Sequence, residues 1–368
     1  PFPSRRELVV ARVEAWRSAH PVREAATFFL AGFVWDIITL DRIDSVLPTI
    51  QHAVWLVILA ALLLLTERHA PGGVPPSPRM KKLLSVSEAA IHFFFGGLLS
   101  SFALFYVRSA SGLAGMTFCM LMFGLLVGNE LPQLRRLGPV IRFALYSFCI
   151  TSWLAYVLPM AFGYLSVWIF LLSVLLAFGV CWGLFRLVVR FRGDSNRAVR
   201  TTLLPAAAMQ ALLVGLYTLQ LVPPVPLSVQ TMGVYHGLEK SGGKYRLLHQ
   251  RADWKFWQRG DQEFLARDGD VVHVFAAVFA PRGFRDRVNI RFLREDPRRG
   301  WQTSDVIPLT ITGGRDQGFR GHVRKSHHQP GDWRVQVETE DGRIIGHMEF
   351  EIIPDTATTE RVFKEDLL

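Results

Sequence analysis

The chain has 368 residues, of which 50% are hydrophobic and 20% charged, and its formal net charge is +10. This composition is too apolar for ordinary soluble domains, and 12% aromatic residues exclude a disordered chain. Three cysteines in so long a chain exclude a disulfide-built scaffold. The basic charge raises nucleic acid as a partner, so the positions of the charges have to decide that point.

Apolar stretches of membrane length occur only before Pro223. A bilayer core about 30 Å thick requires about 20 apolar residues in a helix. Seven stretches meet or approach this length: 25–40, 46–66, 84–107, 111–131, 139–161, 163–189 and 201–222. The sequence therefore predicts an α-helical polytopic membrane bundle of about seven spans over residues 24–223.

The basic residues of this segment are distributed unevenly. Of the 19 Lys and Arg residues before Pro223, 17 fall on one side of the predicted spans and only Arg42 and Arg108 on the other. The positive-inside rule makes the first side cytoplasmic. We therefore expect a cytoplasmic N-terminus and an extracytoplasmic C-terminal domain. The charge is a topology signal, so the expected partner is the lipid bilayer and not nucleic acid.

Residues 1–23 predict an amphipathic helix ahead of the first span. Ser4 and Glu7 have the spacing of a capping box, and Val9, Val13 and Trp16 share one helical face among arginines. We expect residues 4–20 to lie as a helix in the cytoplasmic membrane interface. A contact with a partner protein is the alternative.

Residues 224–368 have the pattern of a β-domain, after a proline-rich linker at 221–227. Strands are predicted at 229–238, 244–250, 271–280, 288–294, 306–312, 319–325, 333–339 and 344–353. Ser241-Gly242-Gly243 and Asp341-Gly342 predict two hairpin turns, because they supply residues that tolerate positive φ. About eight short strands in this length predict an all-β, immunoglobulin-like sandwich.

Short motifs along most of the chain carry a family resemblance. They are Gly32–Asp36, Thr39–Asp44, Phe95–Ser101, Asn129-Glu130, Phe279–Pro281, Gly313–Gly321, Gly331–Val335, Asp341–Arg343 and Gly346. Through them the chain resembles uncharacterised bacterial multipass membrane proteins with a C-terminal domain of unknown function, of the type catalogued under number 2914. The resemblance implies a bacterial inner-membrane protein with a periplasmic β-domain. It implies no activity.

Ionisable and polar residues within the predicted spans are candidate functional groups, because burying them in a bilayer is unfavourable. The candidates are Asp36, His52, Glu88, His92, Asn129, Glu130, Arg142 and Gln210. One interpretation is a proton or ion pathway; the other is a set of helix-end ion pairs, including one between Glu130 and Arg142, and interhelical hydrogen bonds. For Gln210, which lies among small residues, the sequence favours a hydrogen bond between helices.

In the β-domain, arginines and tryptophans form the candidate surface for an anionic or envelope partner. The candidates are Arg291, Arg294, Arg315, Arg320, Trp254 and Trp257. The arginines suit phosphate or carboxylate groups, but a self-paired strand face is the alternative because acidic residues interleave with them. The tryptophans suit stacking on a sugar, with core packing as the alternative.

No motif in the chain predicts catalysis. The sequence lacks a Ser/His/Asp set, a zinc-protease His-Glu-x-x-His motif and the glycine motifs of nucleotide binding. We expect no catalytic residue, metal or cofactor. The leading hypothesis is a non-catalytic scaffold or accessory subunit, in a membrane complex or a homo-oligomer, whose periplasmic sandwich binds an envelope protein or glycan. The alternative is a transporter or ion or proton channel using Asp36, His92 and Glu130.

Overall fold

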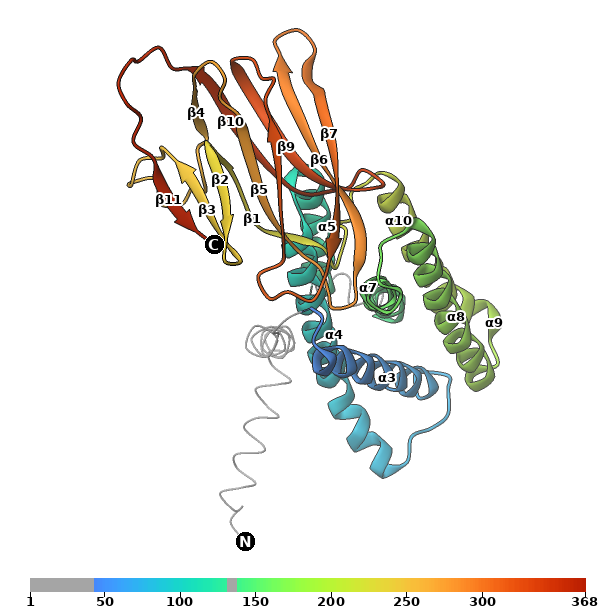
Figure 1. Ribbon diagram of the computed structural model, residues 1–368. Coiled ribbons are helices and arrows are strands. Elements are labelled where there is room, and N and C mark those ends of the chain that lie inside the picture. Colours follow the sequence, from blue (N-terminus) through green and yellow to red (C-terminus); the bar gives the residue numbers. More distant parts are fainter. Residues whose placement is uncertain (1–42, 131–137) are drawn as a thin grey trace, which may run out of the picture. The chain divides into compact units, whose positions relative to one another are not determined.

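The computed structural model of the chain describes residues 43–130 and 138–368 (Figure 1). The predicted interfacial helix 4–20, the first predicted span 25–40 and Asp36 lie outside the described residues. Side chains at 114, 123 and 125–130 are also not described, so Asn129 and Glu130 are defined only as the last two residues of a helix.

The chain divides into two compact units. The second comprises residues 106–117, 159–166 and 220–368, and the remainder of the chain forms the first.

Long apolar helices make up most of the first unit, although some of their end residues, within 106–117 and 159–162, belong to the second. They are α3 (Val46–Arg68), α4 (Pro78–Ser109), α5 (Gly112–Glu130), α7 (Gly138–Phe162), α8 (Val167–Arg192) and a final stretch of α9 (Ser195–Ala198), η1 (Val199–Leu203) and α10 (Leu204–Thr218). Within the described residues, five of these helical stretches have the length and composition to cross a membrane. The expectation of apolar helices of this length is thus confirmed for the stretches at 46–66, 84–107, 139–161, 163–189 and 201–222. The stretch at 111–131 is helical from Gly112 to Glu130 but is not among the five.

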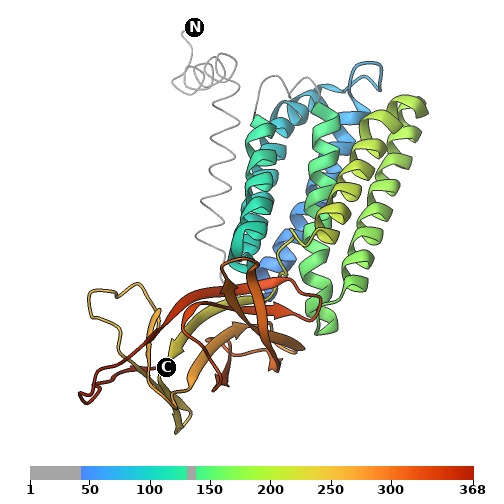
Figure 2. The same cartoon turned by 90° about the horizontal axis from the view of Figure 1, so that it is seen from above.

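The last helical stretch begins earlier than the sequence predicts. The Asp194 side chain accepts a hydrogen bond of 2.9 Å from the backbone N–H of Arg197, and this N-cap starts the helix at Ser195 instead of residue 201. The helix ends at Thr218, where Gln220 adopts a positive φ of 58° before the prolines of the linker. Helices α8 and α10 lie side by side in this unit (Figure 2).

Helix α3 has apolar side chains both on its buried face and on its exposed face. Its buried stripe, His52, Leu56, Leu59 and Leu63, recurs every three to four residues, which places these side chains on one face. Its other face exposes large apolar residues: Val46, Leu47, Ile50, Val54, Val57 and Ile58. A helix that is apolar all round is compatible with a membrane protein.

Eleven strands make up the described C-terminal region. They are β1 (Ser228–Tyr235), β2 (Gly237–Ser241), β3 (Lys244–His249), β4 (Glu263–Ala266), β5 (Val272–Phe279), β6 (Arg285–Asp296), β7 (Gly300–Thr312), β8 (Phe319–Lys325), β9 (Gly331–Thr339), β10 (Ile344–Pro354) and β11 (Lys364–Leu367). They form sheets of order β1-β5-β8, β4-β10-β9-β6-β7 and β11-β3-β2. Figure 1 shows β10, β9, β6 and β7 side by side in the five-stranded sheet.

The first two sheets share a hydrophobic core. Val274 of β5, Val323 of β8, Ile290 of β6, Val335 of β9 and Phe350 of β10 belong to one buried cluster. Buried and more exposed positions alternate along most of β6 and β8, which puts their apolar side chains on one face of each sheet. Strand β5 is buried at nearly every position, because Phe275 and Ala277 pack in a second cluster with Tyr245 and Leu247.

Both predicted hairpin turns are present. Ser241 pairs with Lys244 across Gly242 and Gly243, whose φ angles of 59° and 81° suit a two-residue turn, and Gly342 has φ 83° between β9 and β10. Strands β4 and β11, which have four residues each and mixed polarity, were not predicted, and β1 and β2 were predicted as one strand at 229–238. Such short segments carry too little periodicity to be recognised.

Candidate functional site

The connection between β3 and β4 carries three exposed aromatic side chains. Trp254, Phe256 and Trp257 are 65%, 79% and 60% exposed. The Trp254 and Trp257 ring centroids lie 5.5 Å apart, and those of Phe256 and Trp257 lie 5.2 Å apart, in edge-to-face geometry. We call residues 250–261 the aromatic loop. A cluster of exposed rings is unfavourable in water, which makes this loop a candidate interaction surface.

Turns and one lysine hold the tip of the aromatic loop. The backbone N–H of Lys255 donates to Ala252, and that of Gln258 donates to Lys255, each at 3.0 Å. Lys255 Nζ lies 5.4 Å from the Trp254 ring centroid and 2.6 Å from Glu263 Oε1. The rings are therefore presented on a structured turn beside a cationic side chain.

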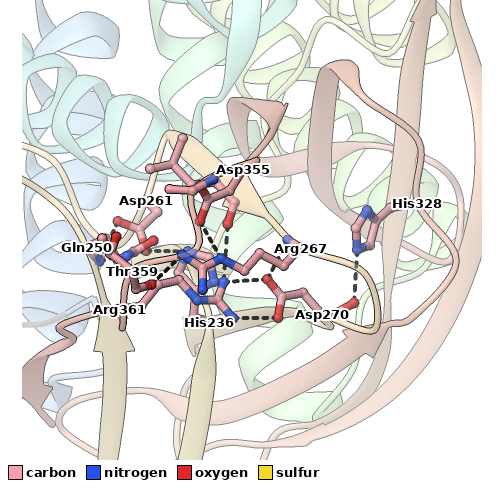
Figure 3. Close-up of polar contacts among 11 residues, drawn as sticks. His236, Gln250, Asp261, Arg267, Asp270, His328, Asp355, Thr359 and Arg361 are labelled. Atoms are coloured by element: carbon pink, nitrogen blue, oxygen red, sulfur yellow. Dashed lines mark hydrogen bonds and ion pairs between the residues drawn. The ribbon is translucent and has the colours of Figure 1, made fainter.

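Asp261 closes the base of the aromatic loop. Its two carboxylate oxygens accept the backbone N–H of Gln250 at 2.9 and 3.1 Å, which joins the first and last residues of the loop (Figure 3). Its own backbone N–H donates to Val234 of β1 at 2.7 Å. Arg251 adds a second tie by donating to the Gln258 carbonyl at 2.9 Å. We call the contact between Asp261 and Gln250 the clasp.

The clasp is buried beside a histidine. Asp261 is 2% exposed, and Asp261 Oδ2 lies 3.7 Å from His236 Nε2, beyond hydrogen-bond distance. Burial raises the pKa of Asp261 to about 7, although the backbone donors of Gln250 and Arg251 favour its charged form. Burial, aided by the positive charge of Arg361, lowers the pKa of His236 to about 4. The His236 ring stacks on Phe264 with centroids 4.0 Å apart, so its neutral form sits in apolar surroundings.

A neighbouring network of charges anchors the segment that follows β10. Arg267 Nε donates to Asp355 at 2.6 Å, and Arg361 donates to both Asp270 oxygens at 2.5 and 2.8 Å (Figure 3). His328 Nε2 lies 3.0 Å from the Asp270 carbonyl oxygen. These contacts hold a stretch without regular secondary structure against β4 and the turn after it.

The predicted arginine candidates are engaged within the β-region. Arg291 Nε donates to both oxygens of Glu338 at 2.9 Å. Arg294 donates to Gln329 and, at 3.3 Å, to the Pro330 carbonyl. Separately, Arg320 donates to Gln317, while the Arg315 guanidinium lies 5.8 Å from the Phe319 ring centroid. Of the four, Arg291 pairs with a carboxylate, as in the self-paired alternative, and the other three contact amide, carbonyl or aromatic groups. Trp254 and Trp257 are exposed.

In the helical unit, His52 joins three helices. Its Nδ1 lies 3.0 Å from the Tyr156 hydroxyl and its Nε2 lies 2.9 Å from the Ser101 hydroxyl. His52 is 1% exposed, so both ring nitrogens are satisfied in a closed environment. These two hydrogen bonds connect α3 to α4 and α7, which is a structural role.

Gln210 makes a second interhelical contact. Its amide nitrogen donates to Ser147 Oγ at 2.9 Å and to Thr151 Oγ1 at 2.7 Å. These bonds join α10 to α7 at a point where the small residue Ala206 is fully buried.

Two ion pairs occur toward the helix ends of this unit. Arg142 donates to Glu88, whose carboxylate also lies 3.9 Å from His92, but the Glu88 side chain is 59% exposed. Arg142 therefore has an acidic partner on α4, and the predicted pair with Glu130 involves a side chain that is not described. The sequence analysis missed the buried pair between Glu67 and Arg192, at 3.0 Å, because both residues resemble ordinary helix-end charges.

Among the residues that the structure describes, no group of three or more His, Cys, Asp and Glu side chains is placed to hold a metal ion. Sequence reasoning also missed Asp261 and His236, since nothing in the local pattern distinguishes them from surface residues. The aromatic loop with its clasp is the candidate site.

Comparison with protein families places a domain in the C-terminal region. Residues 285–352 match the family described as "Protein of unknown function (DUF2914)", as the resemblance predicted. The matched residues lie within the second unit. No curated protein matches the chain significantly in sequence.

Solved structures share only distant likeness with the chain. An immunoglobulin-like protein from Pseudomonas aeruginosa is 12% identical over 35% of this chain and 98% of its own, with a TM-score of 0.21. A β-glucosidase from Listeria innocua is 12% identical over 25% of this chain, which spans only 15% of the enzyme, with a TM-score of 0.18. An alkylpurine DNA glycosylase from Pseudomonas fluorescens is 11% identical over 74% of this chain and 72% of its own, with a TM-score of 0.18. At these scores none of the three defines fold or function.

Proposed function

We propose that the chain is a non-catalytic bacterial inner-membrane protein that presents an immunoglobulin-like sandwich in the periplasm to bind an envelope partner. The observation that carries the proposal is the aromatic loop: three rings exposed together on a loop whose ends are clasped. A preorganised loop loses little conformational entropy on binding, and tryptophans dominate the energetics of many interfaces. The partner is a protein or a glycan, since both are recognised by aromatic faces.

The architecture proposed here has about seven spans with a cytoplasmic N-terminus. Support comes from the apolar helices, from their exposed apolar faces and from the uneven distribution of basic residues. Two sheets with a shared core, antiparallel except for the parallel pairing of β4 with β10, support the immunoglobulin-like sandwich.

The location of the aromatic loop is tested by labelling. Phe256→Cys in the full chain provides an exposed thiol, while Cys149 and Cys181 are buried and Cys119 lies within α5. A membrane-impermeant maleimide should label this variant in cells whose outer membrane is permeabilised, above the level of the unsubstituted chain. Labelling that requires rupture of the inner membrane would contradict the proposed topology.

The partner is tested by photo-crosslinking in cells. A photo-reactive phenylalanine analogue at Phe256 should give an adduct that the same analogue at Val306, an exposed residue of β7, does not give. Digestion separates the two classes, because protease removes a protein adduct and a muramidase removes a peptidoglycan adduct. Replacing both Trp254 and Trp257 with serine should weaken the adduct by about tenfold or more. Equal crosslinking at both positions, in a loop shown to lie outside, would refute partner binding there.

The alternative of a transporter or channel gains no specific support from the described residues. Of the three residues on which it depends, only His92 has a described side chain, and this is buried beside Glu88.

A further inference from the structure

A groove opens on the surface of α8 near the C-terminal end of this helix. It has a volume of about 530 Å³, and its lining includes Gly183, Arg186, Leu187, Arg190 and Ser195. At Gly183 the space that a side chain would fill is open, since no atom lies within 4 Å of an added Cβ. The missing side chain thus contributes to the hollow.

The groove carries two positive charges without a counter-charge from the described residues. Arg186 and Arg190 are exposed and lie four residues apart, so they share one face of the helix. Neither guanidinium forms an ion pair or hydrogen bond with a residue of the described chain, whereas nearby Arg192 is bound to Glu67 and Pro71. Two like charges at this spacing repel each other, and an anion between them would remove that repulsion.

The groove lies about one bilayer thickness along α8 from an exposed tryptophan near the start of the helix. Trp168, near the start of α8, is 75% exposed, and the 18 residues from there to Arg186 span about 27 Å of helix. The bilayer core is about 30 Å thick. Between these ends α8 exposes a series of large apolar side chains: Leu171, Leu175, Leu176, Val180 and Trp182. If α8 crosses the bilayer, Arg186 and Arg190 stand at the level of the lipid phosphates.

We propose that this groove binds the headgroup phosphate of an anionic phospholipid. The guanidinium groups of Arg186 and Arg190 are suited to bind phosphate oxygens, because their planar donors match the geometry of that group. The acyl chains would lie along the exposed apolar face of α8. The site is distinct from the aromatic loop and depends on insertion of α8 into a bilayer, not on the envelope partner.

The proposal is tested by native mass spectrometry of the full-length protein released from detergent with added lipid. The protein should retain phosphatidylglycerol about tenfold more strongly than zwitterionic phosphatidylcholine. Arg186→Gln with Arg190→Gln should abolish this preference. The matched control is Arg79→Gln with Lys82→Gln, which removes two exposed charges from the start of α4 and should preserve it.

A second pair of variants tests the groove without altering charge. Gly183→Leu fills the hollow and should reduce retention of the anionic lipid, whereas Gly179→Leu, at another open position of α8 that does not line the groove, should not. Circular dichroism and gel filtration verify that each variant remains folded.

Two outcomes would overturn the proposal. One is equal retention of phosphatidylglycerol by the groove variants and by their controls. The other is displacement of the lipid by millimolar inorganic phosphate, which would define a site for free phosphate instead. Loss of membrane insertion would be seen separately, by fractionation, and would challenge the topology proposal.

Discussion

Replacing Asp261 with asparagine removes the buried charge of the clasp while keeping its shape. The amide oxygen of asparagine can still accept the Gln250 N–H that the carboxylate accepts at 2.9 Å. What changes is titration, because asparagine does not ionise. The variant therefore isolates the electrostatic part of the clasp from its hydrogen bond.

The expected magnitude follows from two opposing pKa shifts. The pKa of Asp261 is raised from 3.8 to about 7, so its contribution to stability is present below pH 3.8 and is lost as the pH rises to 7, a loss of about 4 kcal/mol. The pKa of His236 is lowered from 6.5 to about 4, so its contribution grows by about 3 kcal/mol as the pH rises through that interval. Between pH 4 and 6.5 the two nearly cancel in the unsubstituted protein. In Asp261→Asn only the His236 contribution remains, and stability should rise by about 3 kcal/mol over this range.

Hydrogen exchange measured by mass spectrometry is the suitable assay, because it reports the opening free energy of peptides covering β1 and the aromatic loop. Exchange is recorded on the full chain in detergent between pH 4.5 and 6.5 and corrected for the intrinsic pH dependence of amide exchange. Asp253→Asn is the control, since Asp253 lies in the same loop but is exposed and paired with Lys364. It should leave the pH profile unchanged.

A profile for Asp261→Asn that stays parallel to that of the unsubstituted protein would refute the reasoning. It would mean that Asp261 does not hold its proton in the folded protein. A second check is His236→Phe, which should show the opposite slope, with stability falling as the pH rises from 4 to 6.5.

Two further predictions concern packing in each unit. Glu67→Gln should destabilise the helical unit by about 3 kcal/mol, because it leaves Arg192 buried without its partner, whereas Glu88→Gln, at an exposed pair, should cost less than about 1 kcal/mol. Thermal unfolding in detergent compares them, and equal losses would contradict the difference in burial. Gly260→Ala should destabilise the β-region by more than Gly269→Ala does. Both glycines have positive φ, which costs an alanine about 1–2 kcal/mol of conformational strain. Only at Gly260 would the added Cβ also clash, because it would lie 2.0 Å from the backbone oxygen of Val234. Hydrogen exchange around the aromatic loop measures this difference, and equal effects would show that the loop base can shift to make room.

The described helices and most strands could be predicted from the sequence because their signals are local. The stretch at 46–66 is a helix at Val46–Arg68, and the strand predicted at 319–325 is β8. Asp341-Gly342 forms its predicted turn because glycine readily adopts the positive φ that a tight hairpin connection needs. Where the local signal is weak, as in the four residues of β4, prediction failed.

The candidate site was only partly visible in the sequence. Trp254 and Trp257 were recognised as candidates, but their exposure could not be distinguished from core packing without the fold. Phe256, between them, was overlooked, although alternation of aromatic and charged residues in a loop is a usable signal. The partners of Arg291 and Arg142 required distant strands and helices to be placed first.

The sequence by itself determined the division into an apolar helical segment and a β-rich segment, and the asymmetry of basic charge along the first. These properties depend on hydrophobic length, on strand alternation and on turn residues, which act over a few neighbouring positions. Only the tertiary structure decided that Asp261 closes the aromatic loop, that Glu67 neutralises Arg192 and that Arg186 and Arg190 line a groove with no acidic partner among the described residues. Those outcomes depend on burial and on contacts between residues far apart in the chain, because a charge acquires its role from the surroundings that packing creates.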